Sequence, residues 1–226
     1  MSVTRCVQRR IEAVGFSAAV KPFAMLPAGR PPSGFALRCL QWGWGNPGYS
    51  AGARYLRHVS ERAVAASGPV LECGSGLTTV VLGLLARRNG FDVVTLEHDP
   101  NWHARITETL ARLGLDRVRV HLAPLQRYGT FDWYDVSDLP DTQDFDLVVC
   151  DGPPGKTRGG RVGLMPLMGD RLADDAVILL DDTRRKRERR AIDLWRRRRP
   201  LTVRPMGRTG RCAEIRLGPR AKQVAV

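Results

Sequence analysis

The sequence predicts an α/β fold: a doubly wound, mostly parallel sheet with helices on both faces and an irregular N-terminal extension. Three observations support this prediction. Short apolar segments alternate with helical periodicity between residues 69 and 199, and the glycine turn Gly74-Ser75-Gly76 directly follows the first segment. The segments 145–150 and 176–181 are apolar nearly throughout, which is typical of strands covered on both faces. Strands that alternate with helices favour parallel pairing through right-handed crossovers.

The N-terminal part is expected to be an extension over residues 1–48 that precedes one domain over residues 49–226. A short amphipathic helix is predicted for residues 4–14. The prolines and glycines of residues 22–48 are incompatible with long regular structure. Ser50 is placed to cap the first helix of the domain.

Apolar periodicity, together with glycine and proline positions, sets the expected elements of the domain. In chain order these are helix 51–66, strand 69–73, helix 77–88, strand 92–97, helix 101–113, strand 117–121, an irregular stretch to residue 143, strand 145–150, helix 161–173, strand 176–181, helix 184–198, and strands 201–205 and 211–217 as an antiparallel edge pair.

The composition is that of an ordinary globular protein. The 226 residues are 43% hydrophobic and 26% charged, enough to bury a core. No segment approaches the length of about eighteen apolar residues that a membrane span needs, and no apolar run of signal-peptide type is present. We therefore expect a cytoplasmic protein with no membrane partner. The five cysteines lack the paired spacing of a zinc site.

The net charge of +13 is concentrated in one segment. Residues 184–199 contain ten Arg or Lys against Glu188 and Asp193, a local excess of +8. Such a basic stripe binds phosphates or acidic surfaces in some proteins. An arginine-rich helix face in solvent gives the same pattern. We favour the solvated face and keep nucleic acid as the less favoured partner.

Acidic residues end four of the expected strands. Glu72, Glu97, Asp151 and Asp181 all stand at the carboxyl end of an apolar segment. Because ligands bind beyond the carboxyl ends of parallel strands in open α/β sheets, we expect these acids to converge on one site.

The first two acids and the glycine turn fit a nucleotide-binding unit. Glycines allow the backbone to approach the ligand, and Glu97 at the end of the next strand suits ribose hydroxyls. Glu72 beside the turn would repel the pyrophosphate of a dinucleotide, whereas it would attract the ammonium and sulfonium groups of S-adenosylmethionine. Gly76 is followed by Leu77-Thr78-Thr79, without the third glycine of the dinucleotide fingerprint. These features favour a methyltransferase over a dehydrogenase, although a buried, partnered acid is a structural alternative for both glutamates.

Residues 68–217 resemble the class I S-adenosylmethionine-dependent methyltransferases, which have a Rossmann-like fold. The resemblance is carried by Glu72 with its spaced glycines, by Glu97 in Leu96-Glu97-His98-Asp99-Pro100, and by Asp151 in Val149-Cys150-Asp151-Gly152-Pro153-Pro154. It implies S-adenosyl-L-methionine as cofactor, with these binding residues: Glu72, Gly74, Ser75, Gly76, Glu97 and Asp151. His98 follows Glu97 and is a candidate for lying beside the adenine or ribose, although a simple loop histidine gives the same pattern. Thr78 stands where a third glycine often occurs, which bears on helix packing more than on cofactor binding.

The second half is similar to narrower groups. Catechol-type O-methyltransferases hold Mg²⁺ with an acid after the fourth strand and an acidic or amide pair after the fifth, and Asp151 followed by Asp181-Asp182 has that order. The resemblance implies a metal site at these three residues, because Mg²⁺ prefers oxygen ligands and lowers the pKa of a bound hydroxyl. A lysine of those enzymes is replaced by Pro154 here. The blocks Asp151–Gly155, Arg161 and Asp181–Arg184 are also similar to plant glucuronoxylan O-methyltransferases, which act on sugar hydroxyls.

The aspartates also have structural alternatives. Asp151 is suited to start a turn before Gly152-Pro153. Asp181 and Asp182 are suited to cap the following helix and to offset the basic residues that oppose its dipole. Three arginines are candidates to neutralise the carboxylates without a metal, namely Arg161, Arg184 and Arg185.

The leading hypothesis is a methyltransferase that acts on a hydroxyl of a small molecule or saccharide, with Asp151 and Asp182 as catalytic residues. An RNA methyltransferase that uses the basic stripe and a non-catalytic nucleotide-binding module are the alternatives. Enzymes that methylate base amines usually place Asp or Asn directly before Pro-Pro and an aromatic residue, whereas Gly152 interrupts that pattern here. Trp133 and Tyr134 are candidates for lining an acceptor pocket. The acceptor and the oligomeric state are left open.

Overall fold

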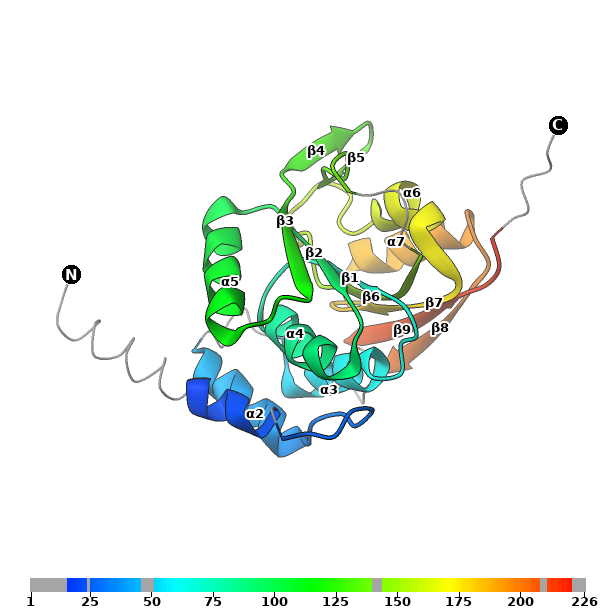
Figure 1. The fold of residues 1–226 in the computed structure, drawn as a ribbon. Coiled ribbons are helices and arrows are strands. Elements are labelled where there is room, and N and C mark those ends of the chain that lie inside the picture. Colours follow the sequence, from blue (N-terminus) through cyan, green and yellow to red (C-terminus); the bar gives the residue numbers. More distant parts are fainter. Residues whose placement is uncertain (1–15, 24, 46–50, 140–143, 208–210, 221–226) are drawn as a thin grey trace.

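A seven-stranded sheet forms the centre of the molecule, with helices on both of its faces (Figure 1). The computed structural model describes residues 16–23, 25–45, 51–139, 144–207 and 211–220. The strand order is β3-β2-β1-β6-β7-β9-β8. The sheet consists of β1 (Val70–Cys73), β2 (Val93–Glu97), β3 (Val118–Leu122), β6 (Phe145–Cys150), β7 (Leu172–Leu180), β8 (Leu201–Met206) and β9 (Cys212–Leu217).

The pairing confirms the predicted doubly wound topology. β1 is parallel to both β2 and β6, β2 is parallel to β3, and β6 is parallel to β7. β9 is antiparallel to β7 and to β8, so the two last strands form the expected antiparallel edge. After β1, the chain adds β2 and β3 towards one edge of the sheet. After β6, it adds β7 towards the other edge. In open α/β sheets this switch point is where ligands bind.

The helices pack as two layers. They are α2 (Gly34–Trp44), α3 (Ala53–Ala63), α4 (Leu77–Asn89), α5 (Pro100–Leu113), α6 (Leu164–Met168) and α7 (Lys186–Arg196), with a short 3₁₀ turn, η1 (Gly169–Arg171), after α6. One core cluster joins α2, α3, α4 and α5 to one face of the sheet, and a second joins α6 and α7 to the other face. No helix in the described ranges is long and apolar enough to span a bilayer.

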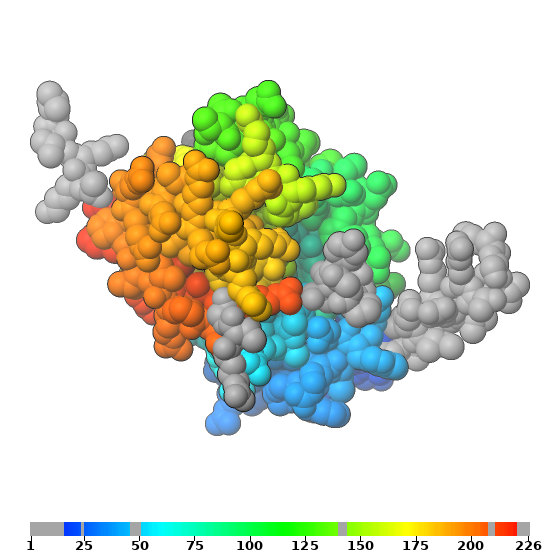
Figure 2. All heavy atoms as spheres, turned by 180° about the vertical axis from the view of Figure 1, so that it is seen from behind, coloured from blue at the N-terminus to red at the C-terminus, as the bar shows by residue number. Residues whose placement is uncertain are grey.

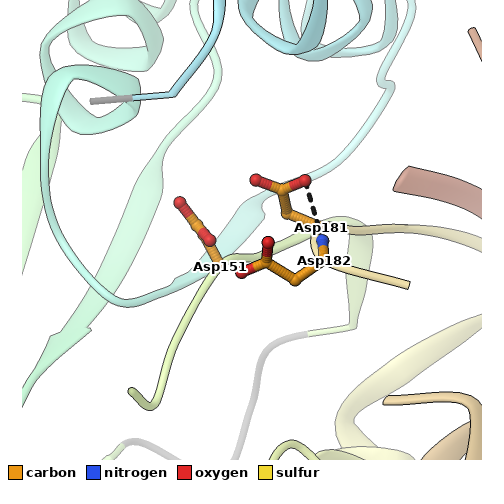
Figure 3. A group of neighbouring side chains, drawn as sticks. All are labelled: Asp151, Asp181 and Asp182. Carbon is orange, nitrogen blue, oxygen red and sulfur yellow. Dashed lines mark hydrogen bonds between the residues drawn. The ribbon is translucent and has the colours of Figure 1, made fainter. Parts of the chain in front are cut away.

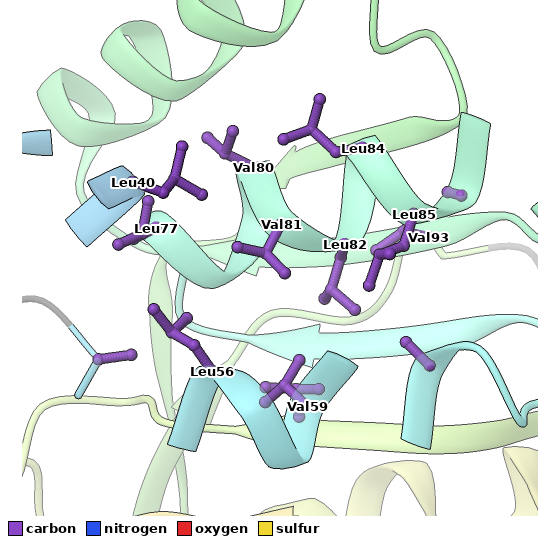
Figure 4. Packing of buried hydrophobic residues seen from close by; sticks show 14 of the residues in the cluster. Leu40, Leu56, Val59, Leu77, Val80, Val81, Leu82, Leu84, Leu85 and Val93 are labelled. Atoms are coloured by element: carbon purple, nitrogen blue, oxygen red, sulfur yellow. The ribbon is translucent and has the colours of Figure 1, made fainter. Parts of the chain in front are cut away.

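Helix α4 is buried along most of its length, and this holds the glycine turn before it in place. Its residues 77–86 are all buried, because the helix is enclosed by the sheet, α3 and α5. Figure 4 shows its leucines and valines pointing both towards Leu56 and Val59 of α3 and away from them. Burial of such a side chain contributes about 1.5–3 kcal/mol. Gly83 leaves room for Leu115 and Val118, since a Cβ there would lie 2.9 Å from Val118 Cγ2.

The N-terminal region is more regular than predicted. Residues 16–23 are helical, and α2 occupies part of the stretch 22–48 that was expected to be irregular. Four prolines of this stretch precede Ser33, which caps α2 by accepting a hydrogen bond from Ala36 N at 3.2 Å, and Pro47 follows the helix in the sequence, so none of them interrupts it. Leu40 of α2 is fully buried in the same core as α3. The boundary at residue 48 stays a prediction.

Two predictions for the first helices fall partly outside the described residues. The expected helix 4–14 lies outside the described ranges, and so does Ser50, the residue expected to cap the next helix. The helix predicted for residues 51–66 is α3, and its N-cap is Gly52, which offers no side-chain hydrogen bond.

Two further expectations are wrong in the middle of the domain. The stretch expected to be irregular before residue 143 contains the hairpin of β4 (Leu125–Tyr128) and β5 (Phe131–Tyr134), which turns at Gly129 with φ of 61°. The expected helix 161–173 is reduced to α6 and the 3₁₀ turn, because β7 already begins at Leu172. Flanking glycines at 163 and 169 shorten α6.

Candidate active site

A cavity of about 1290 Å³ opens at the carboxyl ends of β1, β2, β6 and β7, where the strand order reverses. Most of the predicted site residues line it: Gly74, Ser75, Glu97, His98, Asp151, Asp181 and Asp182. Glu72 and Gly76 are not among the lining residues. A second cavity of about 350 Å³ lies between α5 and β3 and contains none of the predicted site residues. The larger cavity is therefore the candidate site.

The floor of the cavity is a close contact between two backbone turns. Gly74, at φ of 88°, faces Gly152 of the loop after β6, and a Cβ on Gly74 would lie 2.9 Å from Gly152 Cα. A Cβ on Gly152 would lie 2.2 Å from the hydroxyl oxygen of Tyr134. Side chains at either glycine would therefore separate the turns, and the sequence needs glycine at both positions.

Glu97 holds the turn after β1 in place. Its carboxylate accepts hydrogen bonds from Ser75 N at 3.0 Å, Ser75 Oγ at 2.6 Å, His98 N at 2.8 Å and Asp99 N at 2.9 Å. His98 Nδ1 also lies 3.0 Å from Glu97 Oε1. Burial raises the pKa of Glu97, but these hydrogen bonds outweigh it and hold the pKa at about 2. Glu97 is thus ionised at neutral pH beside the cavity, which suits its predicted role with ribose hydroxyls.

Glu72 lies beneath the glycine turn instead of facing the cavity. The residue is fully buried, and Thr95 Oγ1 donates a hydrogen bond of 2.8 Å to its Oε2. Its other oxygen has no hydrogen-bond partner in the described part of the chain. Burial raises the pKa of Glu72 to about 7, although the hydroxyls of Thr78, Thr79 and Thr95 lower it. The predicted contact of Glu72 with the cofactor stays a prediction.

Three aspartates that follow β6 and β7 also line the cavity, and Figure 3 shows them close together. One oxygen atom from each of Asp151, Asp181 and Asp182 lies within 4.8 Å of the others. Asp182 has φ of 58°, a left-handed conformation that is uncommon outside glycine and that turns its carboxylate towards Asp151. Burial, followed by repulsion from Asp151, raises the pKa of Asp181 to about 6. Burial likewise raises the pKa of Asp151.

Arginines neutralise this cluster. Arg161 is only 1% exposed, and its Nη2 lies 3.1 Å from Asp151 Oδ1 and 3.4 Å from Asp182 Oδ2. Arg185 Nη1 lies 2.8 Å from Asp182 Oδ2, and Arg211 Nη2 lies 3.6 Å from Asp182 Oδ1. The predicted ion pairs of Arg161 and Arg185 are confirmed.

The contact of Arg211 was missed by the sequence prediction, although a signal existed. Arg211 directly precedes β9, and β9 pairs with β7 so that Ala213 lies opposite Leu180. Recognising that pairing would have placed Arg211 beside Asp181-Asp182, which directly follow β7.

The capping role considered for Asp181 and Asp182 is wrong. Helix α7 begins at Lys186 with Arg185 as its N-cap, and no side-chain cap hydrogen bond is present there. Asp181 Oδ1 accepts a hydrogen bond from Asp182 N at 2.8 Å, and Asp182 forms the ion pairs above. Both residues line the cavity, so they are available to a ligand.

The two aromatic candidates for the acceptor pocket behave differently. Tyr134 lines the cavity, is fully buried, and has a hydroxyl without a hydrogen-bond partner among the described residues. Trp133 points into the core against Gly163, where a Cβ would lie 2.5 Å from its ring. The hairpin β4–β5 therefore delivers one aromatic residue to the site and one to the core.

Comparisons with known proteins identify the chain as similar to methyltransferases. A family model described as a methyltransferase domain matches residues 71–183, half of the chain. Protein-L-isoaspartate O-methyltransferase 1 from Syntrophobacter fumaroxidans is 32% identical over 115 residues. The match spans 47% of this chain and 46% of that relative, so less than half the length of each is compared.

Solved structures show the same fold at low sequence identity. A Klebsiella pneumoniae protein, named an O-methyltransferase by inference, has a TM-score of 0.55 at 16% identity. The match covers 95% of this chain and 100% of the Klebsiella chain. The N-terminal domain of human METTL16 in complex with SAH has a TM-score of 0.52 at 13% identity, with 82% of each chain covered. The chain belongs to the methyltransferase-domain family, whose members have the class I fold and depend on S-adenosylmethionine.

Proposed function

We propose that this methyltransferase transfers the methyl group of S-adenosylmethionine to a hydroxyl of a small molecule or saccharide. The observation that carries the proposal is the cluster of Asp151, Asp181 and Asp182, which lines the same cavity as Glu97. Carboxylates beside an acceptor can remove the proton of a hydroxyl. The relative from Syntrophobacter fumaroxidans is also named an O-methyltransferase, which supports oxygen as the methylated atom.

The proposed cofactor half of the cavity lies along the ends of β1 and β2. Glu97 would hold the ribose hydroxyls, and the turn of Gly74, Ser75 and Gly76 would allow the cofactor to lie against the backbone. Gly74 and Ser75 line the cavity, and the absence of a side chain at Gly74 allows its turn to lie against Gly152. His98 is proposed to lie beside the ribose or adenine, since it follows Glu97 and lines the same wall.

The proposed acceptor half lies at the ends of β6 and β7. S-adenosylmethionine, when bound, would supply a methyl group on a sulfonium, and the acceptor oxygen would take that methyl group while the sulfonium becomes a neutral thioether. Asp151 or Asp182 takes the hydroxyl proton. An ordinary aspartate, with a pKa near 3.9, is a poor match for an aliphatic hydroxyl, so positioning must supply most of the rate. The raised pKa of Asp151 improves that match.

A labelling experiment tests the acceptor class. The protein is incubated with methyl-labelled S-adenosylmethionine and, separately, with hydroxylated small molecules, oligosaccharides, RNA and protein. The proposal expects label in an ether of the first or second class. It also expects a large loss of turnover in Asp151→Asn and Asp182→Asn, and no loss in Asp193→Asn, an exposed residue of α7. Label confined to RNA or to protein carboxyl groups would refute it.

RNA is the second candidate acceptor, because most of the basic stripe is exposed. In residues 184–199 the exposed basic residues lie on the face shown in orange in Figure 2, whereas Arg199 is buried and donates hydrogen bonds to Gly218 O and Ala173 O. If the stripe binds RNA, the logarithm of affinity should fall linearly with the logarithm of salt concentration. Undetectable RNA binding at low ionic strength would leave the stripe as a solvated helix face.

A further inference from the structure

Arg161 is the most enclosed cation of the candidate active site. It belongs to the loop between β6 and α6, and it is 1% exposed although it lines the cavity. Its guanidinium donates Nη1 to the carbonyl oxygen of Asp181 and Nη2 to that of Asp151. These two carbonyls follow β7 and β6, so the arginine ties together the ends of neighbouring strands. A side chain held in this way cannot swing into solvent as a surface arginine does.

The position of Arg161 does not fit a divalent cation at the three aspartates. A magnesium ion needs carboxylate oxygens at about 2.0–2.1 Å. The oxygens that would supply them, Asp151 Oδ1 and Asp182 Oδ2, already lie 3.1 and 3.4 Å from Arg161 Nη2. An ion bound to the same oxygens would stand within a few ångströms of a guanidinium that never loses its proton.

The charges of the cluster also argue against a divalent cation at the three aspartates. Three carboxylates face three guanidinium groups, because Arg185 and Arg211 also pair with Asp182. In the described part of the chain the formal charges of these six side chains sum to zero, with the ion pairs made by Asp151 and Asp182 and none by Asp181. The three aspartates have the sequence order of the magnesium ligands in catechol-type O-methyltransferases. Here, however, arginines of the chain supply the positive charge beside them.

We propose that Arg161 is the resident cation of this site and takes the place that a divalent metal ion would occupy. The guanidinium keeps Asp151 and Asp182 close together as carboxylates and aims them into the cavity, so it is a positioning residue. While Arg161 is present, the three aspartates bind no divalent cation. Its part in methyl transfer rests on the proposed function, whereas its occupation of the cation position stands without it.

The test is a metal titration that needs no acceptor. Mn²⁺, whose free ion gives a strong electron paramagnetic resonance signal, is added to wild-type protein, to Arg161→Met and to the double variant Arg161→Met/Asp182→Asn. Wild-type protein should leave the signal unchanged at millimolar protein. Arg161→Met should bind about one Mn²⁺, and the double variant should lose that binding again. A purely structural role for Arg161 would destabilise the variant without creating a metal site.

Two results would overturn the proposal. One is Mn²⁺ binding by wild-type protein that disappears in Asp182→Asn, because the metal would then coexist with Arg161. The other is a folded Arg161→Met, with native circular dichroism, that binds no Mn²⁺. If Arg161→Met does not fold, the comparison of wild type with Asp182→Asn still decides. Failure of the proposed function looks different: labelling would find another acceptor class while the Mn²⁺ results stayed as expected.

Discussion

Glu72→Gln should stabilise the protein at alkaline pH, because it removes a charge that the fold buries at a cost. The pKa of Glu72 is raised by burial from its ordinary 4.5 to about 7. The unfolded chain therefore loses the proton near pH 4.5 and the folded chain only near pH 7, so the stability associated with Glu72 falls as pH rises between these values. One pKa unit corresponds to about 1.4 kcal/mol, which gives a penalty of roughly 3 kcal/mol above pH 7.

The measurement is urea unfolding of wild type and Glu72→Gln at pH 5.5 and pH 8.5. Glutamine has nearly the same shape and no proton to lose. The free energy of unfolding of the variant, relative to that of wild type, should therefore rise by about 2 kcal/mol from pH 5.5 to pH 8.5. Glu97→Gln is the control of opposite sign. The pKa of Glu97 is lowered to about 2, so its ionised form stabilises the fold above pH 4.5, and replacing it should destabilise the protein at both pH values. A difference between wild type and Glu72→Gln that does not change with pH would refute the reasoning.

Three other predictions follow from the site and the core. Glu97→Ala should weaken S-adenosylmethionine binding by roughly 1–3 kcal/mol in calorimetry, since a charged hydrogen-bonding group is lost, and unchanged affinity in a folded variant would contradict its ribose role. Gly152→Ala should destabilise by about 1–3 kcal/mol through its clash with the Tyr134 hydroxyl, and Tyr134→Phe should recover part of that loss in the double variant. Leu40→Ala should cost about 2–5 kcal/mol in thermal or urea unfolding, whereas Phe35→Ala, 71% exposed on the same helix, should cost little; equal losses would argue against α2 belonging to the core.

The convergence of acids was predictable because parallel strands share an edge. Glu97, Asp151 and Asp181 each follow an apolar segment, and all three line the same cavity. Glu72 follows the same rule in the sequence, yet its side chain turns beneath the loop towards Thr95. The strand ends distinguish these outcomes, because Glu72 lies inside β1, whereas Glu97 is the last residue of β2 and the two aspartates directly follow β6 and β7.

Helix α2 shows a limit of composition as a guide. Prolines and glycines made residues 22–48 look irregular, but four of the five prolines precede the capping Ser33, Pro47 comes after the helix, and α2 itself contains none. Its isolated helical tendency is modest, and burial of Leu37 and Leu40 against the domain supplies the stability. That contribution comes from contacts with other parts of the fold, so the local sequence of the helix indicates it only weakly.

The sequence by itself determined the order of strands and helices, the doubly wound sheet and the methyltransferase family, because these depend on local periodicity and on glycine and acid positions along one unit. Only the tertiary structure decided how the charges of the site are paired. Arg161 lies ten residues from Asp151 and twenty-one from Asp182 in the chain, and Arg211 reaches Asp182 from the position just before β9. Such pairs form where loops from separate strand ends meet, and their geometry depends on the packing of the whole sheet.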